Sequence, residues 1–594
     1  MQQNNGLDKR QLIGFVLFSV ILMGFLFYFQ TTQSPKPAEV EKENVVQNAA
    51  SSQTAAVNLN DSVKAGTIQQ YKLQNDELTV DFSTLGGQMT TVRLNNYNSY
   101  DKDNKNKPVQ LFSRNNSQYG FRFRDRTGKV FDTRDLVFTG KADGNTIIMQ
   151  SQINGAVIQF IYTLMDQYRV DFKVRTSGLA RLVTDGKADF LWNYNVREME
   201  KGRSQEQTHT EFVYAFNNYK SYDYDGRGEM SEPKEVLNWL GVKQQFFGAV
   251  IEAHNGFRQS KGAQEPLNEG EFLKKFNYDG QVALNGNELN QDFTWYFMPL
   301  DLDLLRSYGK NFDEILPLGW SFIGTMNRWF FIPVYEMLSG WGIAAGWVIF
   351  LMTIAVKIIL SPVMYKQHKL SAMMRVIRPE IDEVNAKYKD ADPMKKQQEV
   401  MAVYRKAGVN QLAGCLPGLL QVPIFYALFR FFPNMLDLRG KGFWFANDLT
   451  AYDDLIKLPF NIPFLGDHLS VFALACTAVI LIYTMMTAGN MQQPTQEGMP
   501  NMKPLMYIFP IMFLFFLNNA ASGLSWYYFV SNAINIVIIL VIKTFILDEK
   551  KIHAQIQANK AKPKKEGRFQ ARMRQMMEQA QEQQKLQEQQ RRRK

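Results

Sequence analysis

Several apolar stretches in this chain are long enough to cross a lipid bilayer, and they limit the fold more than any other feature. One of them, Gln11–Phe29, lies near the N-terminus. Five more are expected at Trp341–Leu360, Leu412–Phe432, Leu469–Ala488, Leu505–Leu517 and Leu524–Phe545. A helix needs about 20 apolar residues to span the hydrocarbon core. The sequence therefore predicts a membrane α-helical bundle of six transmembrane helices, five of them in a core at residues 341–547, and excludes a simple cytosolic enzyme.

The first apolar stretch is predicted to be an N-terminal transmembrane anchor, residues 1–29. Lys9 and Arg10 precede it, and it ends in Leu-Phe-Tyr-Phe-Gln, whereas a cleavable signal peptide, the alternative, ends in small residues. Residues 30–66 are rich in Gln, Ser, Thr, Ala, Asn and Pro. This composition predicts a flexible linker, because it buries too little apolar surface to offset the entropy lost on ordering.

Between the linker and residue 305, apolar and polar residues alternate, as they do in β-strands that have one buried face. Clear examples are Phe121–Arg124, Ile158–Tyr162 and Val170–Val174. Turn-forming sequences such as Asp143-Gly144-Asn145 separate these runs. Many short antiparallel strands of this kind predict an all-β sandwich domain at residues 67–305.

The distribution of charge predicts the orientation of the spans. Segment Ser361–Gln411 carries ten Lys/Arg and six Asp/Glu, whereas Pro433–His468 carries three Lys/Arg and five Asp. Residues 548–594 carry fourteen Lys/Arg and six Asp/Glu, which is eight of the ten net positive charges of the chain. Lys and Arg are enriched in cytoplasmic loops. We therefore expect both termini in the cytoplasm and the β domain on the exported side.

Three further regions complete the predicted organisation. Residues 306–340 include an amphipathic stretch that fits either a helix in the membrane interface or a helix packed on the β domain. Residues 363–410 have a coiled-coil-like stripe and predict a helical hairpin, whose first arm Pro379 should kink or divide. Residues 548–594 form a basic cytoplasmic tail, either a topology anchor or a segment that docks on the ribosome or on lipid headgroups.

Lys357 is the strongest candidate functional residue, because a charge at the centre of a span costs about 2.5–3.5 kcal/mol on insertion scales. It lies four residues before Ser361, so its ammonium group reaching the cytoplasmic interface is the second interpretation. Other polar residues occur in the spans, and each alone fits a helix–helix hydrogen bond. Together with a lysine they favour a hydrophilic cavity lined by Thr353, Gln421, Asn518, Ser522 and Asn532, near Asn519, Ser525 and Asn535.

Enzyme signatures are missing from the sequence. It has no HExxH pair, no GxxxxGK[ST] phosphate loop and no GxSxG elbow. Its two cysteines, Cys415 and Cys476, lie in apolar segments and provide neither a disulfide framework nor a thiolate metal site. We therefore expect no enzymatic activity, no cofactor and no metal, and transport driven by binding energy or the membrane potential.

Three segments of the predicted core resemble the YidC membrane-protein insertase family. They run from Gly340 to Pro362, from Gly414 to Phe425 and from Ser522 to Asn532. Their order, their spacing and the expected topology agree over about residues 320–547. The N-terminal anchor and the exported β domain resemble the Gram-negative form of the family, whose outer domain is periplasmic.

The resemblance implies an insertase and chaperone that moves nascent membrane proteins from the cytoplasm into the bacterial inner membrane through a hydrophilic groove, without nucleotide hydrolysis. Lys357 matches the single basic residue of that groove, which is usually arginine, and lysine lacks the bidentate fork. Thr353, Gln421 and Tyr528 match groove-facing or substrate-contacting positions. The hairpin matches the element that receives substrate.

Nascent membrane proteins and the bilayer are the implied partners, with the Sec translocon and the ribosome as further candidates and no specific nucleic-acid sequence. The alternative function is a solute transporter or channel with a sensory periplasmic domain. A third interpretation is a membrane-tethered carbohydrate enzyme with its site in the β domain. The pair His209 and Glu211 is too weak a signal to support such a catalytic site.

Overall fold

The computed structural model describes residues 68–101, 105–113, 116–183, 186–230, 235–388, 393–409, 416–463, 465–488, 503–542, 544 and 549–561. The predicted anchor (1–29) and linker (30–66) lie outside these residues. The described residues form two compact units, one from 68–352, 424–477 and 511–529, the other from 353–423, 478–510 and 530–561.

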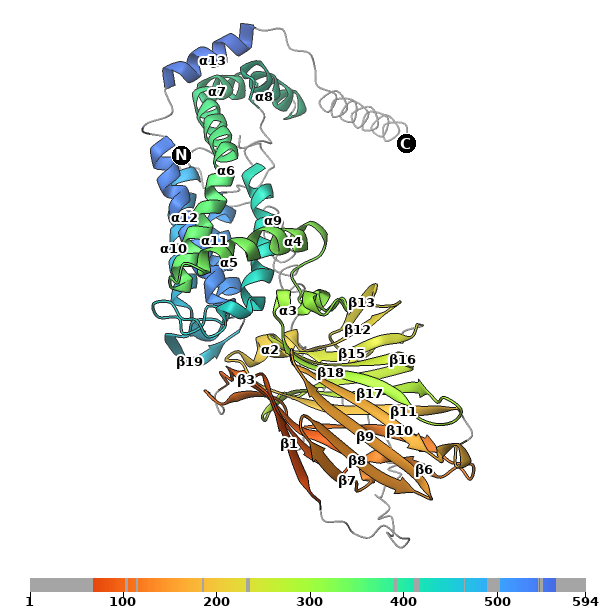
Figure 1. Cartoon of the computed structure of the whole chain (residues 1–594). Helices are drawn as coiled ribbons and strands as arrows, with labels where there is room; N and C mark the ends of the chain where they lie inside the picture. Colours follow the sequence, from red (N-terminus) through yellow and green to blue (C-terminus); the bar gives the residue numbers. More distant parts are fainter. Residues whose placement is uncertain are drawn as a thin grey trace, which may run out of the picture. The chain divides into compact units, whose positions relative to one another are not determined.

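Residues 70–299 form two antiparallel sheets, which confirms a β-rich domain (Figure 1). The smaller sheet contains β1 (Gln70–Gln74), β2 (Leu78–Ser83), β3 (Gln88–Asn98) and β4 (Pro108–Phe112). The larger one has fourteen strands among the described residues, and its main path is β6-β5-β11-β17-β16-β18-β10-β9-β8-β7. These are β5 (Ser117–Arg124), β6 (Val130–Asp132), β7 (Thr139–Asp143), β8 (Thr146–Ile153), β9 (Ala156–Met165), β10 (Arg169–Ser177), β11 (Lys187–Arg197), β16 (Phe247–Pro266), β17 (Phe272–Ala283) and β18 (Gln291–Pro299). Attached to this path are β12 (Glu211–Phe216), β13 (Ser221–Asp225), β14 (Gly228–Glu229) and β15 (Leu237–Lys243).

Aromatic side chains fill the space between the two sheets. Strand β9 alternates buried and half-buried residues along its whole length, as the period-two pattern predicts. Phe112 of β4 reaches across to the larger sheet, where its ring contacts Trp192, Tyr194, Trp295 and Phe297 at centroid distances of 6.3, 5.3, 5.7 and 4.9 Å. Rings at these separations add specific packing energy to the burial of apolar area, so this cluster fixes the two sheets against each other.

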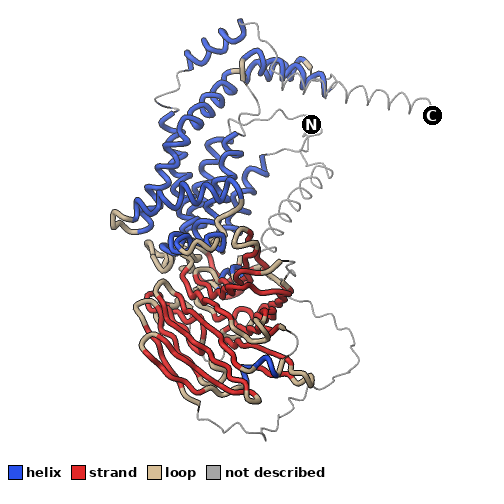
Figure 2. The backbone as a smooth tube through the Cα atoms, turned by 45° about the vertical axis from the view of Figure 1, so that its right-hand side comes forward, coloured by secondary structure: helices blue, strands red, loops and turns tan. Residues whose placement is uncertain are grey.

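Most helices follow the β domain in sequence and are drawn in blue in Figure 2. Helix α2 (Arg203–His209) is an exception, since it lies between β11 and β12. The others are α3 (Leu302–Ser307), α4 (Ser321–Met326), α5 (Ile332–Ser339), α6 (Ala345–Val376), α7 (Arg378–Lys387), α8 (Pro393–Ala407), α9 (Leu416–Phe431), α10 (Val471–Ala488), α11 (Lys503–Asn518), α12 (Ser522–Val541) and α13 (Glu549–Ala561). Strands β19 (Ile456–Ile462) and β20 (Gly466–Leu469) form a hairpin between α9 and α10.

Two of the described helices, α6 and α12, are long and apolar enough to cross a membrane. Shorter apolar segments occur in α10, at Val471–Thr487, and in α11, at Tyr507–Asn518. The structure thus supports a helical membrane region, and the count of six spans stays a prediction.

The predicted amphipathic stretch is divided into α4, a π-helical turn η4 (Asn327–Phe331) and α5. Its buried side includes Asn327, whose Nδ2 donates to the carbonyl oxygens of Leu318 and Ala427 at 2.7 and 2.9 Å. Its other side exposes Trp329, which is 75% exposed, and Phe322. The single helix expected from the sequence is therefore interrupted where the Asn327 side chain bonds to neighbouring backbone.

The predicted hairpin is present, but its first arm is not a separate helix. Helix α6 continues through residue 363 to Val376, and α7 begins at Arg378, so the predicted division near Pro379 is confirmed. The apolar stripe packs against α8 and also against α13, which lies in the segment predicted to be a basic tail. Ile552 and Ile556 of α13 are buried there, and Lys560 Nζ lies 2.5 Å from Glu380 Oε1.

Replacing Ile556 with Ala is expected to release α13 from the hairpin, because truncating a buried isoleucine costs about 2–5 kcal/mol. Ile556 is 2% exposed, whereas the neighbouring Gln557 is exposed. Hydrogen exchange of the full chain should show faster exchange in α13 and α8 for Ile556→Ala and no change for Gln557→Ala. Equal protection in both variants would show that the packing contributes little.

A buried ion pair joins the β domain to the loop that follows α9, within the first unit. Arg439 Nε donates to Glu200 Oε1 at 2.8 Å, and both side chains are less than 10% exposed. The guanidinium also lies 4.5 and 4.9 Å from the ring centres of Tyr100 and Phe247. Burial raises the pKa of Glu200 to about 7, against the opposing charge of Arg439. The contact between the β domain and this loop therefore depends on an ion pair that is almost fully buried.

Candidate functional site

Lys357 lies on α6, and the structure turns its side chain toward α12 within the second unit. Its Nζ donates to Asn535 Oδ1 at 2.8 Å, and only 5% of the residue is exposed. No carboxylate among the described residues forms an ion pair with it. The ammonium is thus held inward by a neutral amide, and extension to the aqueous interface is not the conformation observed.

The partner of Lys357 belongs to a polar row along α12. Ser525, Tyr528, Asn532 and Asn535 follow one another at steps of three and four, a spacing that places them on one helix face. Sequence analysis had noted Asn535 without placing it among the site residues. Which α12 residue faces Lys357 depends on how α12 is rotated relative to α6. The residues of the two helices alone do not reveal this rotation.

Thr353 lies one turn before Lys357 on the same face of α6 and is fully buried. Gln421 on α9 is half-buried, and no contact to Lys357 is seen for it among the described residues. Tyr528 packs in an aromatic cluster of the first unit, with its ring 5.3 Å from that of Phe425 and 6.0 Å from that of Phe513. The structure joins Lys357 to Asn535 and places Thr353 one turn away on α6, and the roles of Thr353, Gln421 and Tyr528 stay predictions.

Asn518 and Ser522 lie at the junction of α11 and α12, where their side chains form hydrogen bonds with the backbone of neighbouring segments. Asn518 Nδ2 donates to the carbonyl oxygens of Leu465 and His468, and its Oδ1 accepts from the backbone of Ser470. Ser522 Oγ donates to the Asp448 carbonyl at 2.9 Å. These bonds occupy their side chains, so a substrate contact at either residue would compete with loop structure, and it stays a prediction.

A metal centre is not indicated by the part of the chain that the structure describes. Within it, no group of three or more His, Cys, Asp or Glu side chains is placed to hold a metal ion. Cys476 is buried, and Cys415 lies outside the described residues.

Comparison with known proteins covers both parts of the chain. Residues 70–332 match the family model described as the YidC periplasmic domain, and residues 337–551 match the one described as 60Kd inner membrane protein. A crystal structure titled as an active YidC insertase with its first transmembrane domain resolved matches at 17% identity and a TM-score of 0.32, over 81% of this chain and 93% of that one.

Curated relatives match over nearly the whole length. The chain is 34% identical to the membrane protein insertase YidC of Parabacteroides distasonis, over 96% of this chain and 97% of the relative. It is 36% identical to the insertase of the same name from Phocaeicola vulgatus, over 90% of this chain and 91% of the relative. These relatives are named insertases rather than enzymes, and the chain belongs to the YidC membrane protein insertase family.

Proposed function

We propose that this chain moves apolar segments of nascent membrane proteins from the cytoplasm into the inner membrane, without nucleotide hydrolysis. The observation that carries the proposal is the buried hydrogen bond between Lys357 and Asn535. An ammonium group can donate three hydrogen bonds. An acceptor group in the polar flank of a substrate can therefore replace Asn535 Oδ1 as the acceptor from Lys357. Exchange of one partner for another lowers the cost of moving that flank through the lipid layer.

Helix length supports the same proposal. Helix α11 has 16 residues, about 24 Å at 1.5 Å per residue, which is shorter than a hydrocarbon core of about 30 Å. A short helix is accommodated by a thinner bilayer beside it. We propose that the apolar segment enters there, with the N- and C-termini of the chain in the cytoplasm and the β domain in the periplasm. The hairpin would receive the substrate, and the Sec translocon and the ribosome remain candidate partners.

Reconstitution tests this function directly. Liposomes that contain only the purified full chain should insert a single-span protein with a short polar flank, and protease protection of that flank should rise several-fold over empty liposomes in nucleotide-free buffer. Liposomes that contain an unrelated membrane protein at the same protein-to-lipid ratio are the matched control. No gain over that control, or solute flux without insertion, would contradict the proposal and favour a transporter.

A further inference from the structure

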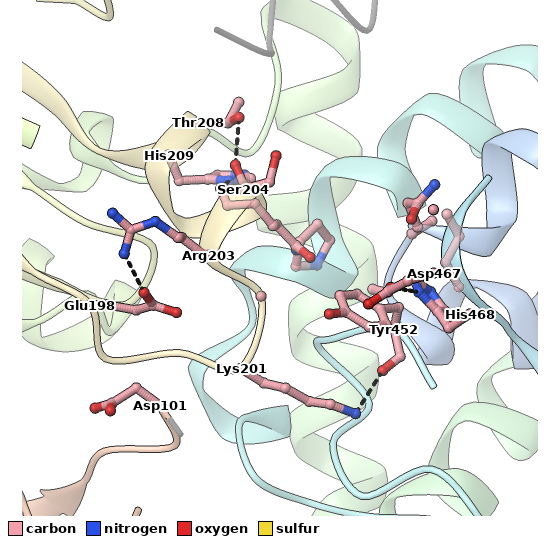
Figure 3. Close-up of a pocket in the computed structure, with 18 of the residues that line it drawn as sticks. Asp101, Glu198, Lys201, Arg203, Ser204, Thr208, His209, Tyr452, Asp467 and His468 are labelled. Carbon is pink, nitrogen blue, oxygen red and sulfur yellow. Dashed lines mark hydrogen bonds and ion pairs between the residues drawn. The ribbon is translucent and has the colours of Figure 1, made fainter. Parts of the chain in front are cut away.

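A cavity of about 820 Å³ lies in the first unit, and Lys357 is not among the residues that line it (Figure 3). One wall comes from the β domain, at α2 and the turn 268–271. The other wall comes from the β19–β20 hairpin and from the ends of α9, α11 and α12. Charged side chains and the apolar residues Phe429, Phe516 and Leu524 both line it. Such a lining fits a ligand that has a charged part and an apolar part.

Aromatic residues of the kind found at membrane interfaces lie close to one lining residue of this cavity. Tyr426 lies one turn before Arg430, a lining residue, and its ring is 5.0 Å from that of Trp320. Trp320 is 65% exposed, and Trp329 and Phe322 are exposed nearby in the chain. Tryptophan and tyrosine are enriched where the hydrocarbon meets the headgroups. Arg430 therefore lies one helical turn from aromatic residues of the kind that gather at the headgroup level.

Arg430 is suited to bind a phosphate. Among the described residues its guanidinium has one polar contact, Nε to the Tyr426 hydroxyl at 3.4 Å, and no carboxylate forms an ion pair with it. Burial, together with the positive charges of Lys243, Arg430 and Lys274, lowers the pKa of His209 to about 3, so His209 stays neutral. This side of the cavity is electropositive, and a guanidinium fork matches phosphate geometry.

The cavity also has an acidic side. Asp467 lies on the β19–β20 hairpin with 81% of its side chain exposed, and Glu269 is exposed on the turn of the β domain. Figure 3 shows Asp467 and His209 at different sides of the cavity. A ligand that carries a phosphate and an amine would meet both charges with the correct sign.

We propose that this cavity binds the headgroup of an aminophospholipid of the phosphatidylethanolamine type. The phosphate is held by Arg430, the ammonium faces Asp467 and Glu269, and the start of the acyl chains contacts Phe429, Phe516 and Leu524. A bound lipid would connect the β domain to the bilayer beside the core. Neither Lys357 nor Asn535 lines this cavity, so failure of the lipid proposal leaves the proposed function intact.

The test is lipid retention by the full chain after delipidation, followed by native mass spectrometry. The probes are phosphatidylethanolamine, phosphatidylglycerol and diacylglycerol with identical acyl chains. Wild type should retain phosphatidylethanolamine most strongly. Arg430→Gln should weaken it about tenfold, as expected for losing a charge-assisted hydrogen bond, and Arg430→Lys should restore part of it. Arg306→Gln is the matched control, because Arg306 lies over the exposed Trp329 ring but does not line the cavity.

A second variant tests the amine half of the site. The double substitution E269Q/D467N should lose the preference for phosphatidylethanolamine over phosphatidylglycerol while both lipids still bind better than diacylglycerol. Equal retention of phosphatidylethanolamine by wild type and Arg430→Gln would overturn the proposal, as would equal retention of diacylglycerol. A photo-cross-linker placed at Gln205, which lines the cavity, should capture lipid, and capture of a translocated peptide alone would also overturn the proposal.

Discussion

Insertion by a Lys357→Glu variant is expected to fall at least about tenfold, because a carboxylate at this position repels acidic flanks and leaves a buried negative charge. Lys357→Met removes the charge at similar length and should lose most of the activity as well. Lys357→Arg should retain most of it. The measurement is protease protection of a single-span substrate in the reconstituted system, normalised to the amount of folded insertase.

Lys366→Glu is the matched control, because Lys366 lies on the same helix α6 but is exposed. Asn535→Ala keeps the charge of Lys357 and removes its observed partner, so its loss of insertion should be smaller than that of Lys357→Met. Wild-type insertion by both Lys357→Met and Lys357→Glu would show that the buried cation has no part in the transfer.

Substitution of Arg439 by Met should destabilise the joint between the β domain and the loop after α9 by about 3–5 kcal/mol. Removing one member of a buried pair leaves the other without compensation, and at a pH above its raised pKa Glu200 is then an unpaired buried carboxylate. Hydrogen exchange of the full chain in nanodiscs should show the effect at residues 198–206 and 436–453. Unchanged exchange there would mean that Glu200 finds another partner.

The effect of Arg439→Met should depend on pH. Arg439 lowers the pKa of Glu200, and Asp448 and Asp101 raise it, so the variant should raise this pKa further above about 7. A carboxyl whose folded pKa exceeds its ordinary value of 4.5 stabilises the fold most below that value and loses this contribution as pH rises through the folded pKa. The loss of stability of the variant relative to wild type should therefore be larger at pH 8.5 than at pH 6. The double substitution E200Q/R439M should remove the difference.

The strands were predictable because each carries its own signal. In β9 and β10 one face is buried by neighbouring strands, so alternation in a short window is enough to locate the element. Helices α10, α11 and α12 were likewise found from runs of apolar residues, with ends shifted by a few positions. A local sequence pattern was sufficient to locate an element wherever the pattern continues along the whole element.

Contacts between distant segments were not predictable in this way. Glu200 and Arg439 are 239 positions apart, and nothing in either neighbourhood selects the other. The choice of Asn535 rather than Asn532 as partner of Lys357 depends on how two helices are rotated. Ile552 and Ile556 did offer a signal, a pair of apolar residues one turn apart, which the high charge of the tail obscured.

Helix α6 carries Lys357 and continues without a break to Val376, just before the division that separates it from α7. From Lys357 to Val376 the helix extends about 28 Å at 1.5 Å per residue. A tilt of about 10° around Lys357 would displace the far end by roughly 5 Å, since a helix moves as a lever of that length. Under the proposed function, a substrate that binds the hairpin would also strain the hydrogen bond between Lys357 and Asn535, so that substrate binding and weakening of this bond would be coupled.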